Sequence, residues 1–165
     1  MKGKGKSKGQ NPDCPCGSGQ RYNACCKPFH LGEEPKDVEQ LMRSRYAAYA
    51  LGEAAYLWRT LHPDHPEKKA QDEQTWTADL RAGRRTLRFV RLRVLDHDQT
   101  RVLFHAELYD AGKERSFVER STFARDEQAG GTWRYLSGEL RACKATALDP
   151  TLTLASFQPA PTGSE

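Results

Sequence analysis

Four of the five cysteines stand close together near the start of the chain, and this group of thiols is the clearest chemistry in the sequence. Two short pairs, Cys14 with Cys16 and Cys25 with Cys26, are separated by eight residues. Their neighbours are mainly proline, glycine, serine and asparagine, which cannot build an apolar core around them. Paired thiolates are typical ligands of a tetrahedral Zn²⁺ ion, which would also supply folding free energy. Four protein ligands leave no position for a reacting water, so we expect one structural zinc ion.

Disulfide bonds and a different fourth ligand are the alternatives to this zinc site. A bond within either short pair would strain the backbone, because disulfides need a Cα separation of roughly 4.4–6.8 Å in a specific orientation. Bonds across the two pairs can form, but they do not persist in a reducing compartment. His30 follows Cys26 by four residues and is a lesser candidate for the fourth ligand.

Length and composition place the chain among ordinary globular proteins. Its 165 residues suffice for one domain with a small appendage, and 37% hydrophobic and 29% charged residues exclude a membrane or fully disordered chain. No stretch approaches the roughly 18–20 apolar residues of a bilayer span, and the basic start lacks the apolar region of a secretory signal. We therefore expect a cytoplasmic protein without a transmembrane segment. The absence of isoleucine beside abundant leucine, alanine and arginine suggests a GC-rich, bacterial genome.

Changes in composition divide the chain into four parts. We expect a flexible basic arm at 1–13, the cysteine block at 14–31, a folded domain at 36–145 and a disordered tail at 146–165.

Periodicity within the domain predicts helices first and strands after them. Apolar residues at helical spacing predict helices over about 37–51, 54–61 and 72–81. Alternation with a period of two then predicts strands over about 87–96, 101–110, 114–125 and 132–140, with turn residues between them. This order predicts an α+β fold in which the helices pack on one face of an antiparallel sheet.

Both the cysteine block and the domain resemble known bacterial sequences. The run DCPCGSG at 13–19, followed by Tyr22 and the second cysteine pair, resembles the SEC-C motif, a zinc-binding tail first described in the preprotein-translocating ATPase. The run LMRSRY at 41–46, the run ERS at 119–121, and Trp133, Tyr135 and Gly138 are similar to the YchJ-like family. This resemblance implies an N-terminal SEC-C motif and an NTF2-like cone, with about three helices against a curved antiparallel sheet of four or more strands. Several relatives carry a second SEC-C block, whereas this chain has only Cys143 near its C-terminus.

The leading functional hypothesis is docking without catalysis. The SEC-C resemblance implies that the zinc knuckle contacts a protein or ribonucleoprotein partner, such as a ribosome, a secretion or chaperone component, or an anionic surface. The NTF2-like domain would then bind a ligand or form a homodimer. A first alternative is binding of nucleic acid or anionic lipid through the lysines of the arm, Lys2–Lys8, and an acid-free arginine run from Arg81 to Arg93.

A second alternative is an enzyme or small-molecule binder that uses the cone as a pocket. The candidate pocket residues are His105, Glu107 and Arg120, with Tyr49 and Tyr135 beside them. The alternation of strand 101–110 argues against this role, because apolar residues claim the core side and leave His105 and Glu107 toward solvent.

Arg45 stands on an otherwise apolar helix face. We expect it to pair with Glu119 or Glu107 and so to fix how the helix docks on the sheet.

Overall fold

The computed structural model describes residues 11–162, so most of the expected arm, with all of Lys2–Lys8, lies outside the described residues. Within them, helices come first and an antiparallel sheet follows, as predicted. The helices are α1 (Lys27–His30), α2 (Val38–Leu51), α3 (Ala54–Arg59), α4 (Pro66–Ala70) and α5 (Glu73–Gly83), with single 3-10 turns η1 (Tyr22–Ala24), η2 (Arg84–Thr86), η3 (Glu127–Ala129) and η4 (Ala145–Ala147). The strands are β1 (Leu87–His97), β2 (Arg101–Asp110), β3 (Lys113–Glu114), β4 (Phe117–Asp126) and β5 (Thr132–Ala142). None of the helices in this described part is long and apolar enough to cross a membrane.

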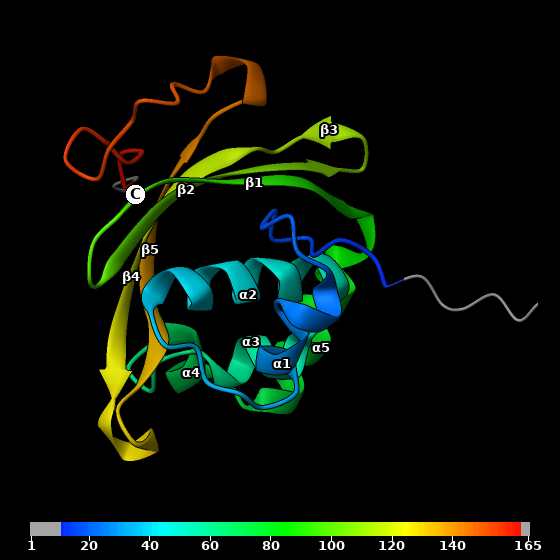
Figure 1. The fold of residues 1–165 in the computed structure, drawn as a ribbon, viewed down its shortest axis with the longest axis vertical. Coiled ribbons are helices and arrows are strands. Elements are labelled where there is room, and N and C mark those ends of the chain that lie inside the picture. Colours follow the sequence, from blue (N-terminus) through cyan, green and yellow to red (C-terminus); the bar gives the residue numbers. More distant parts are fainter. Residues whose placement is uncertain (1–10, 163–165) are drawn as a thin grey trace, which may run out of the picture.

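Helix α2 is the longest helix and lies across the concave face of the sheet (Figure 1). It begins at its predicted N-cap, Asp37, whose carboxylate accepts the Gln40 N–H at 2.8 Å. It ends at Gly52, which adopts a left-handed conformation with φ of 81°. Helix α2 contacts the sheet on one side and the cysteine block on another, and these contacts bury it on both sides. It is therefore the central element of the described part.

The sheet has the strand order β1-β2-β4-β5, and the short β3 pairs with the last residues of β2. All pairs are antiparallel. The two outer strand pairs contain register shifts. The β1–β2 pair shifts twice within β1, and the β4–β5 pair shifts between Thr122 and Phe123. Such irregularities increase the local bending of a sheet. The sheet curves around the helices (Figure 1), which confirms the predicted α+β architecture.

The convex face of the sheet is covered by the C-terminal segment, residues 148–157 (Figure 1). Leu154 and Phe157 are buried against Leu103 of β2 and Val118 of β4. The Leu154 N–H also donates to the Asp96 carboxylate at 2.8 Å. The structure therefore differs from the expected disordered tail at 146–165, because apolar residues on the outer face of two central strands require a cover.

Candidate metal centre and ligand cavity

The four predicted metal ligands meet in one cluster. The Sγ atoms of Cys14, Cys16, Cys25 and Cys26 all lie within 4.8 Å of one another, and none of these cysteines forms a disulfide. The Cys16–Cys25 and Cys25–Cys26 sulfur separations are 3.6 and 3.9 Å. Four sulfurs at 2.3 Å from a tetrahedral Zn²⁺ ion would be about 3.8 Å apart. The thiols therefore fit a closed tetrahedral metal site.

Turns around the first cysteine pair aim backbone donors at the sulfurs. Gly17 and Gly19 have φ of 75° and 80°, a conformation that other residues rarely adopt. The backbone N–H of Cys16 acts to lower the pKa of Cys14, and that of Ser18 acts to lower the pKa of Cys16. A hydrogen bond from the Cys26 thiol lowers the pKa of Cys16 to about 4, whereas burial raises the pKa of Cys14 to about 11. Only a bound cation would ionise all four thiols, so we expect metal binding to release protons.

The cysteine block packs against α2 of the domain. Cys14, Cys16 and Cys26 share one hydrophobic cluster with Leu41 and Met42 of that helix. Outside this cluster, the Arg43 guanidinium donates to the Cys16 carbonyl at 2.9 Å. The block is thus part of the domain's packing rather than a separate knuckle on a free linker.

His30 connects the same two units through both of its ring nitrogens. The Tyr22 hydroxyl lies 2.8 Å from its Nδ1, and its Nε2 lies 2.8 Å from the Ser44 carbonyl of α2. Because a carbonyl can only accept, the Nε2–H of His30 donates to the Ser44 carbonyl, and Nδ1 accepts from the Tyr22 hydroxyl. His30 is outside the thiol cluster, so the structure supports a structural role for it rather than the alternative of a fourth ligand.

A partly buried group of charges holds the linker between the cysteine block and α2. The Glu34 carboxylate accepts from Arg59 of α3 at 2.8 Å and from Arg134 of β5 at 2.8 Å. Arg134 is buried, so this pair is shielded from solvent screening more than a surface pair would be. The sequence reasoning missed Glu34, because it stands in a short polar linker with no periodic pattern.

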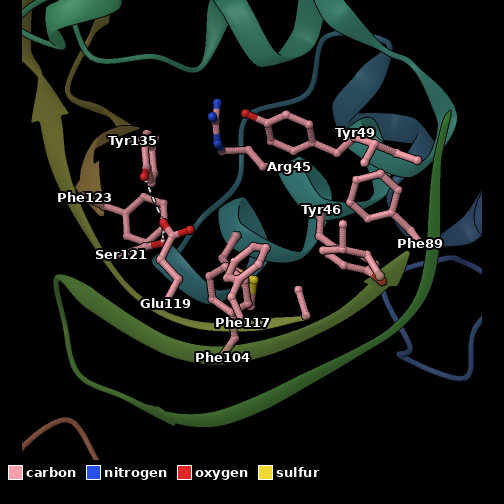
Figure 2. A pocket seen from close by; sticks show the side chains of 14 residues that line it. Arg45, Tyr46, Tyr49, Phe89, Phe104, Phe117, Glu119, Ser121, Phe123 and Tyr135 are labelled. Atoms are coloured by element: carbon pink, nitrogen blue, oxygen red, sulfur yellow. Dashed lines mark hydrogen bonds between the residues drawn. The ribbon is translucent and has the colours of Figure 1, made fainter. Parts of the chain in front are cut away.

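A cavity of about 270 Å³ lies between α2 and the concave face of the sheet (Figure 2). Its walls are mainly aromatic and aliphatic, and its two charged residues, Arg45 and Glu119, lie toward the end that Tyr135 lines (Figure 2). Helix α2 contributes Met42, Arg45, Tyr46 and Tyr49, and the strands contribute Leu87, Phe89, Phe104, Ala106, Leu108, Phe117, Glu119, Ser121, Phe123 and Tyr135.

Glu119 is the acidic group at the polar end of the cavity. Its Oε1 accepts from the Ser121 hydroxyl at 2.7 Å and from the Tyr135 hydroxyl at 2.8 Å (Figure 2). Burial raises the pKa of Glu119 above its usual range, although both hydrogen bonds oppose this shift. Within residues 11–162, Glu119 has no ion-pair partner within 4.0 Å.

Arg45 is the basic group at the same end. Its Nη1 donates to the Leu57 carbonyl at 2.9 Å and to the Thr60 hydroxyl at 2.6 Å, and its guanidinium carbon lies 4.7 Å from the centre of the Tyr135 ring. The expected ion pair of Arg45 with Glu119 or Glu107 is therefore absent from the described part of the chain. The Leu57 carbonyl of α3 and the hydroxyl of Thr60, the C-cap of that helix, hold the guanidinium instead.

Comparison with known proteins agrees with this architecture. Residues 37–138 match the family described as "YchJ, middle NTF2-like domain". The chain belongs to the YchJ family. A relative from Deinococcus radiodurans, described as a UPF0225 protein, is 42% identical over 125 residues, which cover 74% of this chain and 85% of the relative. Another UPF0225 protein, from Ralstonia nicotianae, is 38% identical and matches 77% of this chain and 90% of its own length.

Solved structures of SEC-C motif proteins share the fold of this YchJ family chain. The solution structure of a SEC-C motif containing protein from Rhodopseudomonas palustris matches with a TM-score of 0.62 and 36% identity, over 76% of this chain and 96% of that one. A crystal structure of a SEC-C motif containing protein from Psychrobacter arcticus gives a TM-score of 0.57 at 20% identity, over 75% and 80% of the two chains, which supports the fold alone. The NTF2-like domain behind a SEC-C cysteine cluster is thus the architecture of this YchJ family member.

The candidate pocket residues named from the sequence of this YchJ chain lie on the convex face, away from the cavity. The strand register shows the orientation of His105 and Arg120. They pair with Val118 and Leu103, so all four side chains lie on the same face of the sheet. His105 is buried, with Nε2 2.9 Å from the Cys143 carbonyl, and Arg120 binds Glu139 at 2.8 Å. Glu107 has the same orientation as His105, two positions along β2. The structure therefore does not bring these three residues into the cone, whereas Tyr49 and Tyr135 do line it.

The arginine run of the YchJ domain separates into structural and exposed members. Arg84 donates to the Tyr49 and Ala50 carbonyls at the C-terminal end of α2. Arg88, Arg91 and Arg93 are exposed on the convex side of the edge strand β1, and they form no ion pair within the described part. Binding of an anionic polymer through this run stays a prediction.

We expect Glu119→Gln to change how stability depends on pH. Because burial raises the folded-state pKa of Glu119, the stability from its protonated form is fully present below its ordinary pKa of 4.5 and is lost as the pH rises through the raised value. The amide cannot ionise, so the Tm advantage of the variant over the unchanged chain should grow from pH 5 to pH 8. Circular dichroism melting at several pH values measures this. Glu33→Gln, at an exposed position, is the control and should show no such trend; a constant Tm difference for Glu119→Gln would contradict the assignment.

Proposed function

We propose that this chain is a zinc-stabilised binding protein whose NTF2-like domain takes up a small, largely apolar molecule. The observation that carries the proposal is the cavity of about 270 Å³ behind α2, with aromatic walls and two ionisable groups at one end. Ligand sites in proteins are typically concave and apolar, with few polar groups that set the orientation of the bound molecule. Protein interiors are close-packed, so a core without a binding role would be filled by its own side chains.

Zinc has a supporting role in this proposal. Four thiolates would hold the ion in a closed site, so it would stabilise the cysteine block and supply no reacting water. Because this block packs against Met42 and its neighbours on α2, and Met42 also lines the cavity, zinc would stabilise one wall of the binding site. The enzyme alternative stays a prediction.

Docking of the cysteine block to a macromolecular partner also stays a prediction. One side of the block is occupied by α2, so a partner would have to meet the opposite side. The block exposes Ser18, Gly19 and Gln20, and Leu31, which follows α1, is 76% exposed. These residues are the ones to change in a capture experiment.

The cavity proposal is tested with a neutral apolar fluorophore, N-phenyl-1-naphthylamine, and variants that fill the cavity. Ala106 lies on the cavity floor, so Ala106→Leu should weaken saturable binding at least tenfold while leaving Tm unchanged or higher. Met42→Phe repeats this test from the helix side. Ala78→Leu, on the exposed surface of α5, is the matched control and should bind as the unchanged chain does. No saturable binding, or equal binding by the filled variants with intact melting, would overturn the proposal.

A further inference from the structure

The Arg45 guanidinium presents one edge that the protein does not fully use. Both hydrogens of Nη1 are used by the Leu57 carbonyl and the Thr60 hydroxyl, whereas Nε and Nη2 donate to no carbonyl or carboxylate within residues 11–162, and the Tyr49 hydroxyl stands beside the guanidinium. The Tyr46 hydroxyl is the one side-chain polar atom of the described part that is both fully buried and without a partner. The Nε and Nη2 atoms of Arg45 are therefore not fully buried. The Nε and Nη2 donors of an arginine form a planar fork that matches the two oxygens of a carboxylate.

The rest of the polar end favours an anion over a cation. Arg45 carries a positive charge and is only 6% exposed. Glu119 uses Oε1 for two hydrogen bonds from hydroxyl groups, and within residues 11–162 it forms no ion pair with Arg45. Figure 2 shows the Tyr49 hydroxyl directed toward Arg45, which adds a further polar group beside the free edge. Within the described part, no carboxylate among the lining residues of the cavity therefore pairs with Arg45.

The remaining walls define the body of the molecule. Phe89, Phe104, Phe117 and Phe123 line the cavity, and Arg45 is the one Lys or Arg among its lining residues. A single cation suits one carboxylate better than a dianionic phosphate, whose second charge would be buried without a partner. A volume of about 270 Å³ lies just below the roughly 300–1,000 Å³ of drug-sized ligand sites, which limits the occupant to a compact molecule of about ten to twenty non-hydrogen atoms.

We infer that the cavity binds a small carboxylic acid, with an aromatic or aliphatic body against the phenylalanine walls and its carboxylate on the free Nε–Nη2 edge of Arg45. This inference rests on the proposed binding function and names its ligand class. The α3 contacts of Nη1 and the Tyr135 ring hold the guanidinium in place before the ligand arrives, so little conformational freedom is lost on binding.

The test compares ligands that share a body and differ only in the head group. Isothermal titration calorimetry on the full chain would use 3-phenylpropanoate, its primary amide and 3-phenylpropylamine, and also nonanoate with nonanamide. We expect each acid to bind at least tenfold more tightly than its amide, because a charge-assisted, bidentate contact is lost, and we expect no binding of the amine. This comparison needs no variant and so does not depend on refolding.

Variants of Arg45 add a second readout. Arg45→Met should weaken acid binding at least tenfold more than it weakens amide binding, and Arg45→Lys should restore part of the acid affinity, because it returns the charge without the fork. Equal affinity of acid and amide would overturn the carboxylate inference and leave the cavity proposal standing. Failure of both acids while N-phenyl-1-naphthylamine binds would do the same. Failure of the acids and of the fluorophore would overturn both.

Discussion

Replacement of Cys16 by serine is expected to abolish stoichiometric zinc binding and to destabilise the whole domain. Cys16 is fully buried, and its sulfur lies 3.6 Å from that of Cys25 in the thiol cluster. Loss of the ion would release the block that covers α2 and would also withdraw the Cys16 carbonyl from Arg43. We expect an unfolding free energy lower by about 3 kcal/mol or more, which for this chain length corresponds to a Tm lower by about 6–12 °C. Metal analysis of the purified protein and circular dichroism melting measure the two effects.

The fifth cysteine provides a matched control for this experiment. Cys143 is outside the thiol cluster and is only partly buried, so Cys143→Ser should keep one zinc ion and an unchanged Tm. Two outcomes would contradict the argument. Full zinc content in Cys16→Ser would show that another group completes the site, and zinc loss without a change in Tm would show that the cysteine block does not stabilise the domain.

Local patterns were sufficient to predict α2, α3, α5, the four long strands and the thiol cluster, but not the short α1, α4 and β3. Helix α2 begins at an aspartate N-cap and carries apolar residues at helical spacing, and the strands show a period of two, so both signals are contained in a few neighbouring residues. The cysteine pairs lie within one short segment, and turn residues between them bring the pairs together. The close match of these elements with the structure reflects agreement between local preference and tertiary packing.

The cover of the convex face was not predictable from the tail itself. Its apolar residues, Leu148, Leu152, Leu154 and Phe157, follow no regular period and stand among threonine, serine and proline. Their packing partners are far away in the sequence. A usable signal was present in β2, where Val102, Leu103 and Phe104 are apolar on both faces, since a strand that is buried on both sides needs a second layer.

The candidate pocket residues differ from the observed lining by a single step along a strand. In β4 the apolar Phe117 and Phe123 have the same parity as Glu119 and Ser121, so all four face the cavity, whereas Arg120 faces outward. The alternation of β2 already argued that His105 and Glu107 face away from the core, and the same argument applied to β4 selects Glu119 over Arg120. Polar residues on the apolar face of a strand are the more informative signal, because burial makes them costly unless they have partners.

Gly138→Ala is expected to disturb the polar end of the cavity more than its size suggests. Gly138 pairs with Ser121 across β4 and β5, and a Cβ atom at this position would lie closer than 3.0 Å to Glu119 Oε1 and to the Tyr135 hydroxyl. Neither group can move away without breaking their mutual hydrogen bond. We expect a loss of about 1–3 kcal/mol in unfolding free energy, measured by urea denaturation.

The same substitution elsewhere separates this clash from a general effect of alanine. Gly83 ends α5 with φ of −67°, and nothing lies within 4 Å of a Cβ added there. Gly83→Ala should therefore be neutral or stabilise by about 0.5–1 kcal/mol. If the two variants behaved alike, the close approach at Gly138 would have no energetic consequence.

A double-mutant cycle identifies the partner of the clash. Glu119→Ala removes the carboxyl that the new methyl group meets, so Gly138→Ala should cost much less in that background than in the unchanged chain. Strictly additive effects would show that the carboxyl is not the group displaced. A large coupling would instead show that Gly138 is glycine because Glu119 and Tyr135 must close over it, and hence that the backbone of β5 was shaped around the polar end of the cavity.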